Sequence, residues 1–201
     1  MKLYYAPKTR ATRARWMLEE IGAPYELVRI DLSKGEQKKA DYLKIHPHGA
    51  VPAFSDGDVT IFESAAVCAY LADKFPDKQL APPVGSAARG PYYQWLVYSM
   101  ATAEPPAVKV FLNTVMLPEA KRSAAAAEEG RAQWAEVARV LERAIDGKRF
   151  LLGDQFTAAD VMIGSIAGWA GFMGLLEGFS GLQTYVARLT SRPAYRRAIA
   201  D

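Results

Sequence analysis

The chain has 201 residues, half of them apolar, which is enough to bury a core in one large domain or two small ones. Its formal charge of +3 comes from 25 basic and 22 acidic residues, and no basic tract carries interleaved aromatic residues. Composition therefore gives no indication of a nucleic-acid partner. The single cysteine, Cys68, excludes an internal disulfide and is typical of a reducing compartment.

The first third of the chain alternates between strand and helix patterns. Four short segments predict strands: residues 3–5, 25–30, 51–54 and 59–62. The last two are joined through Asp56-Gly57, which is a hairpin signal. One helix is expected to end near Ile21 with Gly22 as its stop, and another covers residues 63–75. The polar segment 31–44 predicts a loop with room for one helical turn. This order indicates an α/β unit with an antiparallel edge.

The rest of the chain has the pattern of a linker followed by helices. Residues 79–88 are rich in proline and small side chains and predict the linker. Residues 128–145 give the clearest helix, with apolar residues at helical spacing: Trp134, Val137, Ala138, Leu141 and Ile145. The apolar run 161–176 is shorter than the ~20 residues of a membrane span, so we expect a buried helix with Trp169 and Phe172 in the core.

The stretch H-P-H-G-A-V-P-A-F ends in a proline that opens a short strand. Proline cannot pair through its nitrogen. If the Val51-Pro52 bond is cis, the N–H and C=O of Val51 would point away from the sheet. An extended peptide ligand could then pair with both groups as an added strand. The alternative is an edge-strand proline with no ligand.

The stretch F-E-S-A-A closes a strand and opens a helix at Glu63 and Ser64. Free N–H groups at a helix N-terminus can hold a carboxylate, and the neighbouring Glu63 could take an ammonium group. The pair suits the head group of an α-amino acid. Ordinary helix capping is the alternative.

Together these motifs resemble the soluble glutathione transferases over the whole chain, closest to the phi-like and bacterial branches. The family pattern G-E-x-K-K-x-x-Y-L-x-x-N-P-x-G-x-V-P-A-F is similar to G-E-Q-K-K-A-D-Y-L-K-I-H-P-H-G-A-V-P-A-F here. The second half contains F-L-L-G-D-Q-F-T-A-A-D, in which Thr157 and Asp160 form a capping box. The resemblance implies a thioredoxin-like glutathione-binding domain, a linker and an all-α C-terminal domain, over residues 1–78, 79–88 and 89–201.

The resemblance also implies how glutathione binds. Val51 would pair with the cysteinyl backbone beside a cis Pro52, while Glu63 and Ser64 would hold the γ-glutamyl head group.

The glycine end of the expected site departs from the family pattern. Gln37 and Lys38 fall where relatives contact the glycyl carboxylate, but Ala50 stands where relatives often have a longer polar side chain. His46 replaces the usual asparagine. His46 and His48 are the only histidines, and without a third ligand they do not make a metal site. We expect both in a surface loop.

The stretch A-P-K-T-R-A-T-R-A-R-W places four cations where a helix begins, an end at which positive charge is unfavourable. In the family, the residue at this point activates the sulfur of glutathione. Lowering a thiol pKa by about two units requires roughly 2.7 kcal/mol of preference for the thiolate. Thr9 aligns with the phi-type catalytic serine and is the expected donor. Arg10 is the supporting or alternative stabiliser, and Thr12 is the third candidate.

Nearby residues have structural alternatives. The alternative for Thr9 is that it caps the helix and has no role in catalysis. Arg13 and Arg15 are expected to pair with Glu19, Glu20 or the other domain. Tyr5 stands where some bacterial relatives have an active-site tyrosine, but we expect it in the core. Cys68 is also expected in the core. The lack of C-x-x-C excludes a thioredoxin-type dithiol cycle.

The resemblance implies a homodimeric, cytoplasmic glutathione transferase whose co-substrate glutathione attacks an apolar electrophile. Six apolar or aromatic residues after the linker could line a pocket for the second substrate. Each of them could instead belong to the core or to a dimer contact: Tyr92, Tyr93, Trp95, Tyr98, Met100 and Phe111. No metal, nucleic acid or membrane partner is expected. The alternatives are a glutathione-dependent peroxidase or disulfide reductase, a non-catalytic glutathione or hydrophobic-ligand binder, and a structural or regulatory protein that kept only the fold.

Overall fold

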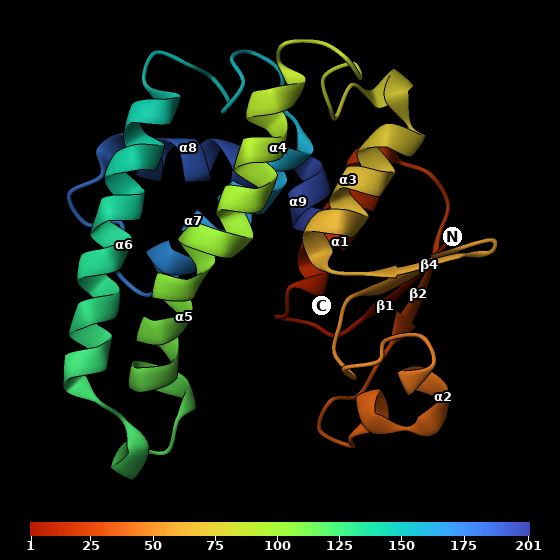
Figure 1. Cartoon of the computed structure of the whole chain (residues 1–201), viewed down its shortest axis with the longest axis horizontal. Coiled ribbons are helices and arrows are strands. Elements are labelled where there is room, and N and C mark those ends of the chain that lie inside the picture. The colour runs from red at the N-terminus through yellow and green to blue at the C-terminus, as the bar shows by residue number, and fades with distance from the viewer. The chain divides into compact units, whose positions relative to one another are not determined.

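The computed structural model describes residues 1–201. By compactness the chain separates into two units, Met1–Ala81 with Ser191–Asp201, and Pro82–Thr190. Figure 1 shows a sheet with helices in the first unit and helices alone in the second. The expected fold class, an α/β part followed by an all-helical part, is confirmed.

The sheet of the first unit has four strands in the order β2-β1-β3-β4. These are β1 (Lys2–Tyr5), β2 (Glu26–Arg29), β3 (Ala53–Asp56) and β4 (Val59–Phe62). β1 runs parallel to β2 and antiparallel to β3, and β3 pairs with β4 as a hairpin in which Asp56 lies opposite Val59. β3 begins later than expected because Pro52 has no N–H to give to a ladder.

The first unit also contains four α-helices. They are α1 (Ala11–Ile21), α2 (Ala40–Leu43), α3 (Ser64–Lys74) and α9 (Pro193–Ala198), with 3₁₀ turns at Glu36–Lys38 and Pro76–Lys78. α1 ends as expected, since Gly22 has φ 72° and its N–H bonds to the Leu18 carbonyl. The core is formed by fully buried side chains from the sheet, α1 and α3: Leu3, Met17, Leu18, Phe54, Val67 and Leu71.

The segment expected as a loop over residues 31–44 contains more helix than one turn, a 3₁₀ turn followed by α2. Local side-chain bonds explain this. The Asp31 carboxylate accepts from the Ser33 N–H at 3.0 Å, and the Glu36 carboxylate accepts from the Asp31 N–H at 2.8 Å.

The last residues of the chain return to the first unit, where α9 packs on α1 (Figure 1). The Tyr195 and Trp16 rings meet edge to face at 4.8 Å. Arg192 holds Glu20 through two bonds of 2.6 and 2.8 Å, and Arg197 holds Glu19 at 2.6 Å. The expected domain bounds, 1–78, 79–88 and 89–201, remain a prediction, while compactness groups residues 191–201 with the first unit.

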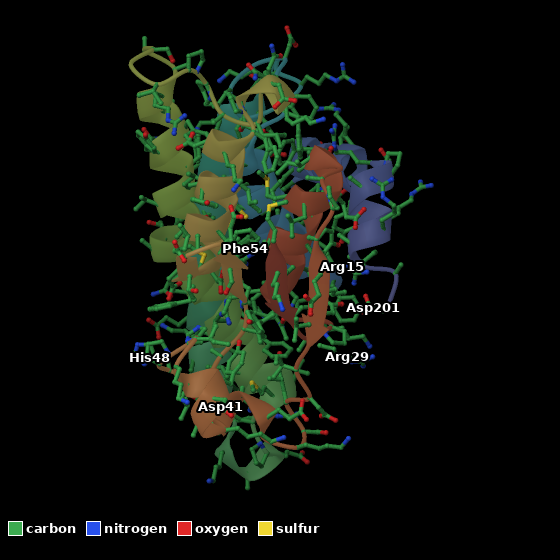
Figure 2. All side chains as sticks on the ribbon, turned by 90° about the vertical axis from the view of Figure 1, so that its right-hand side faces the viewer. Arg15, Arg29, Asp41, His48, Phe54 and Asp201 are labelled. Carbon is green, nitrogen blue, oxygen red and sulfur yellow. The ribbon has the colours of Figure 1, made fainter.

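These pairs bear on the partners expected for Arg15, which were Glu19, Glu20 or the other domain. Glu19 and Glu20 are held by arginines from the C-terminal segment. Arg15 forms an ion pair with Asp201, which falls within the range 89–201 expected for the other domain, and Figure 2 shows the two side by side.

The second unit consists of five α-helices, α4 (Arg89–Tyr98), α5 (Glu104–Phe111), α6 (Ala124–Ile145), α7 (Ala158–Phe172) and α8 (Ser180–Thr190). π-helical segments continue α4 and α5, over Ser99–Ala103 and Leu112–Met116. A 3₁₀ turn, Glu119–Lys121, precedes α6. The five apolar residues expected on one face of α6 are all buried.

α7 begins at the expected capping box. Thr157 and Asp160 exchange both bonds of that motif. Trp169 is half-buried, but the prediction that Phe172 lies in the core is wrong, since this side chain is 91% exposed. Phe172 is the last residue of α7, and an almost wholly apolar helix gives no sequence signal for which residues face inward. None of the helices is both long and apolar enough to cross a bilayer.

Candidate functional site

The N-terminal end of α1 carries the three residues expected to act on a sulfur atom. The Thr9 hydroxyl donates to the Ala6 carbonyl at 2.7 Å and accepts from the Ala11 N–H at 3.2 Å. Thr9 therefore caps the first turn. Arg10 is exposed and its side chain makes no cap bond, while Thr12 is half-buried. No acid lies in the first turn, so the positive end of the helix dipole keeps its full effect on a nearby anion.

The Val51-Pro52 bond is cis, as the resemblance implied. Val51 is half-buried and lies just before β3. Its N–H and C=O bond to no other backbone group. The Ala50 carbonyl next to it accepts from the Tyr42 hydroxyl at 2.7 Å, which fixes the approach to Val51 from α2. The chain thus offers one free backbone donor and one free acceptor at this edge.

Glu63 and Ser64 stand at the corner between β4 and α3. Glu63 is exposed and has φ 72° and ψ 114°, which is unusual for a residue other than glycine. Ser64 is buried, and its hydroxyl accepts from the Arg13 guanidinium at 3.3 Å. No side chain caps α3, so its first N–H groups are available to an anion.

The residues expected at the glycine end lie in the 3₁₀ turn beside the segment 46–49. The Lys38 ammonium donates to the His48 carbonyl at 2.7 Å, and the side-chain amide of Gln37 donates to the Leu32 carbonyl at 3.4 Å. The buried side-chain oxygen of Gln37 has no partner. Gly49 has φ 57°, and a Cβ there would collide with the Gln37 carbonyl, so only glycine allows this close approach.

The expectation of two surface histidines is right for His48 but wrong for His46, which is 5% exposed. The His46 ring stacks on Phe62 at 4.7 Å, and its Nδ1 has no hydrogen-bond partner. Burial, together with the neighbouring His48, lowers the pKa of His46. The burial of His46 could not be predicted from its polar turn, because the ring that covers it, Phe62, comes from β4, further along the chain. The described residues contain no group of three or more His, Cys, Asp or Glu that could hold a metal ion.

Two further side chains are structural, as expected. Tyr5 is buried, and its hydroxyl donates to Asp201 at 2.8 Å and accepts from Arg15 at 3.1 Å. Cys68 is fully buried, and burial raises the pKa of its thiol to about 12. Neither is presented as a nucleophile or acid.

The aromatic residues expected near a second substrate lie in the second unit and differ in exposure. Tyr92 and Trp95 are buried and belong to the core, whereas Tyr93 is exposed. Tyr98 and Met100 are half-buried, and the half-buried Phe111 meets Trp169 at 5.2 Å. An open cavity of about 700 Å³ lies elsewhere in this unit, between the end of α6 and the start of α8, and includes none of the expected residues.

Sequence reasoning missed two residues that the structure ties to the candidate site. Arg13 connects α1 to Ser64, and His46 connects the turn before Val51 to Phe62. The sequence does mark both residues as unusual, since Arg13 lies in a helix start without acids and His46 replaces an asparagine. Neither feature predicts which residue would be the partner.

Comparison with known proteins gives matches along both units. Residues 1–73 match the glutathione S-transferase N-terminal domain, and residues 124–188 match the glutathione S-transferase C-terminal domain. Glutathione S-transferase GstA of Escherichia coli O157:H7 is 30% identical, over 100% of this chain and 98% of the relative. Glutathione S-transferase F10 of Arabidopsis thaliana is 32% identical, over 98% and 95%. The structure of a sphingomonad glutathione S-transferase complexed with glutathione has a TM-score of 0.86 at 26% identity, over 100% of this chain and 98% of the other.

Proposed function

The chain belongs to the glutathione S-transferase family, and from this premise we propose how this glutathione transferase works. It binds glutathione in its first unit, stabilises the sulfur as a thiolate and directs it at an apolar, electrophilic second substrate. The observation that carries the proposal is the pair of free backbone groups on Val51, which suits an extended peptide. The solved relative with bound glutathione supports the choice of peptide.

We place the γ-glutamyl head group at the corner between β4 and α3. The exposed carboxylate of Glu63 is suited to an ammonium group. The hydroxyl of Ser64 and the first N–H groups of α3 are suited to the carboxylate of the same amino acid. The three parts together recognise an α-amino acid and not an amine or an acid alone.

We place the glycyl carboxylate near Gln37 and Lys38. The Lys38 ammonium donates one N–H to the His48 carbonyl, and its remaining two N–H groups can reach a carboxylate. Ala50 contributes no polar group here, so this end of the ligand is held by fewer contacts than the γ-glutamyl end.

The thiolate lies at the start of α1. Thr9 is the proposed donor, with Arg10 as the supporting cation and Thr12 as the third candidate. In the structure the Thr9 proton goes to the Ala6 carbonyl, so the proposal requires the hydroxyl to turn to the sulfur when glutathione binds. Glutathione carries the nucleophile, and the chain contributes orientation and electrostatics.

The experiment replaces Thr9 and follows the absorbance of the bound thiolate against pH. Thr9→Val removes the hydroxyl and keeps the shape of the side chain. We expect it to raise the apparent thiol pKa of bound glutathione by about one unit, the effect of one hydrogen bond to a charge. Thr9→Ser is the matched control and keeps the native titration. An unchanged titration in Thr9→Val moves the role to Arg10 or Thr12.

A second candidate function is binding of glutathione without transfer, and the commitment of the Thr9 proton to Ala6 favours it. Turnover of a chlorinated aromatic, an organic peroxide and a mixed disulfide, compared with retention on immobilised glutathione, separates the two. Retention without any of the three reactions supports the binding protein. We further propose a homodimer in the cytoplasm, and sedimentation tests the dimer.

A further inference from the structure

The corner at Glu63 has an unfavourable backbone conformation. Glu63 has φ 72°, in a region that side chains other than glycine rarely adopt. Such a conformation raises the free energy of the chain and persists only where neighbouring contacts determine it. The residues on each side of Glu63 therefore need to be held from outside the corner.

On one side, Arg13 holds Ser64. Arg13 is only 4% exposed, although it carries a charge, and its guanidinium donates to the Ser64 hydroxyl at 3.3 Å. This bond joins two residues that are 51 positions apart, one in α1 and one in the first turn of α3. The guanidinium is a rigid, planar donor, so it fixes the hydroxyl in direction as well as in position.

On the other side, His46 holds Phe62. The buried His46 ring lies nearly parallel to the Phe62 ring, at 4.7 Å and 29°. Phe62 is the last residue of β4 and directly precedes Glu63. The exposed His48 contributes only a more distant edge contact to the same ring, at 6.4 Å. Since His46 begins the turn that leads to Val51, the stack also couples the peptide-pairing edge to the corner.

We propose that Arg13 and His46 are positioning residues for recognition of the γ-glutamyl ammonium group. They fix Ser64 and Phe62, the two neighbours of Glu63, and so direct the Glu63 carboxylate at the ammonium. Neither needs to touch glutathione. This inference rests on the proposed role of Glu63, and it extends that role to two residues outside the corner. A residue that only packs the core would act differently, since its loss would weaken all ligands of the first unit alike.

The test compares two ligands by calorimetry: glutathione and glutaryl-cysteinylglycine, which lacks only the α-amino group. The native chain is expected to prefer glutathione. Arg13→Met and His46→Leu, which keep side-chain volume, are expected to bind glutathione about tenfold more weakly, as for one misaligned bond to a charge. His46→Leu should bind the analogue with nearly native affinity. Arg13→Met, which also releases the Ser64 hydroxyl at the ligand's carboxylate, should weaken the analogue, but less than it weakens glutathione. Arg13→Lys, which keeps the charge, should retain part of the preference.

Matched controls are His48→Leu, an exposed histidine in the same turn, and Arg131→Met, an exposed arginine of α6. Both should keep the native preference, and thermal melting checks the folding of every variant. If Arg13→Met does not fold, Arg13→Lys and His46→Leu decide the matter. Folded variants that keep the native preference, or that weaken both ligands equally, overturn the positioning role. A native chain without any preference would instead overturn the proposed role of Glu63.

Discussion

Burial determines the chemistry of the only thiol in the chain. Cys68 has no exposed surface, and this burial raises its pKa to about 12, although the nearby Arg13 acts to lower it. The thiolate is the reactive form of cysteine. Glutathione must therefore bring the sulfur for any transfer reaction, and Cys68 serves as a small apolar side chain of α3.

We expect Cys68 in the folded chain to resist alkylation. At about pH 8 a thiol with this pKa is ionised in roughly one molecule in ten thousand. Iodoacetamide should leave the native chain unmodified over the time in which the urea-unfolded chain reacts completely, as followed by mass spectrometry. Equal rates of modification in the two states would contradict the buried, un-ionised thiol.

The candidate site residues that follow family motifs could be proposed from the sequence, and the contacts that distant residues make with them could not. Val51, Pro52, Glu63 and Ser64 stand in short motifs with fixed spacing, and local chemistry suggests what each could bind. For Arg13 the expected partners were Glu19, Glu20 or the other domain, and Ser64 was not among them. The bond between Arg13 and Ser64 joins residues 51 positions apart, and no local pattern predicts it.

At the scale of elements, α7 and α8 approach closely at a glycine. A Cβ on Gly164 would collide with the side chain of Leu189, which is itself fully buried. On the same helix, a Cβ on Gly168 would find its nearest neighbour, a methyl group of Val186, at 3.7 Å. The first position is therefore closed to a methyl group and the second is open.

We expect Gly164→Ala to lower the free energy of unfolding by about 1–2 kcal/mol, because overpacking must displace Leu189. Gly168→Ala should be neutral or stabilising by up to about 1 kcal/mol, since alanine favours helix over glycine. Urea denaturation of the two variants and the native chain measures the difference. Equal stability of the two variants would show that Leu189 adjusts without strain.

Most elements could be predicted because their signals are local. The period of α6, the glycine stop of α1 and the hairpin turn all lie within a few residues of the feature that they determine. The position of Phe172 could not, because α7 is apolar on nearly every side and only its neighbours decide which residues are covered. The start of β3 moved by two residues for a local reason, the missing N–H of Pro52.

At the scale of the whole molecule, charge pairs fasten the C-terminal segment to the first unit. Burial acts to raise the pKa of Glu19, but its bonds with Arg197 and Tyr25 outweigh burial and lower that pKa. Burial also acts to raise the pKa of Asp201, but its bonds with Tyr5 and Arg15 outweigh burial and lower that pKa. A carboxylate with a lowered pKa in the folded state stabilises that state while it is ionised.

The expected consequence is a loss of stability in acid. The contribution of both carboxylates is complete above their unfolded pKa of about 4 and disappears as the pH falls through the lowered folded values. Glu19→Gln and Asp201→Asn should lower the urea midpoint at neutral pH and lose less stability between about pH 5 and pH 3. Glu128→Gln, an exposed acid of α6, is the control. Native and variant midpoints that fall in parallel would exclude these pairs as the cause.

The two-part architecture could be predicted from the order of patterns and from the family motifs. The return of residues 191–201 to α1 could not. The contacts involved, such as Arg192 with Glu20, join residues 172 positions apart, and no periodicity of either segment encodes the other.

That return has a consequence for the order of events during synthesis. The strands and α1 leave the ribosome before the second unit, yet Trp16, Glu19 and Glu20 gain their contacts with Tyr195, Arg197 and Arg192 only after the second unit has been translated. The second unit has all of its residues available earlier. The first unit is therefore completed only after the second, and a ribosome that stalls after residue 190 leaves a nascent chain whose first unit lacks the contacts of Trp16 with Tyr195 and of Glu20 with Arg192.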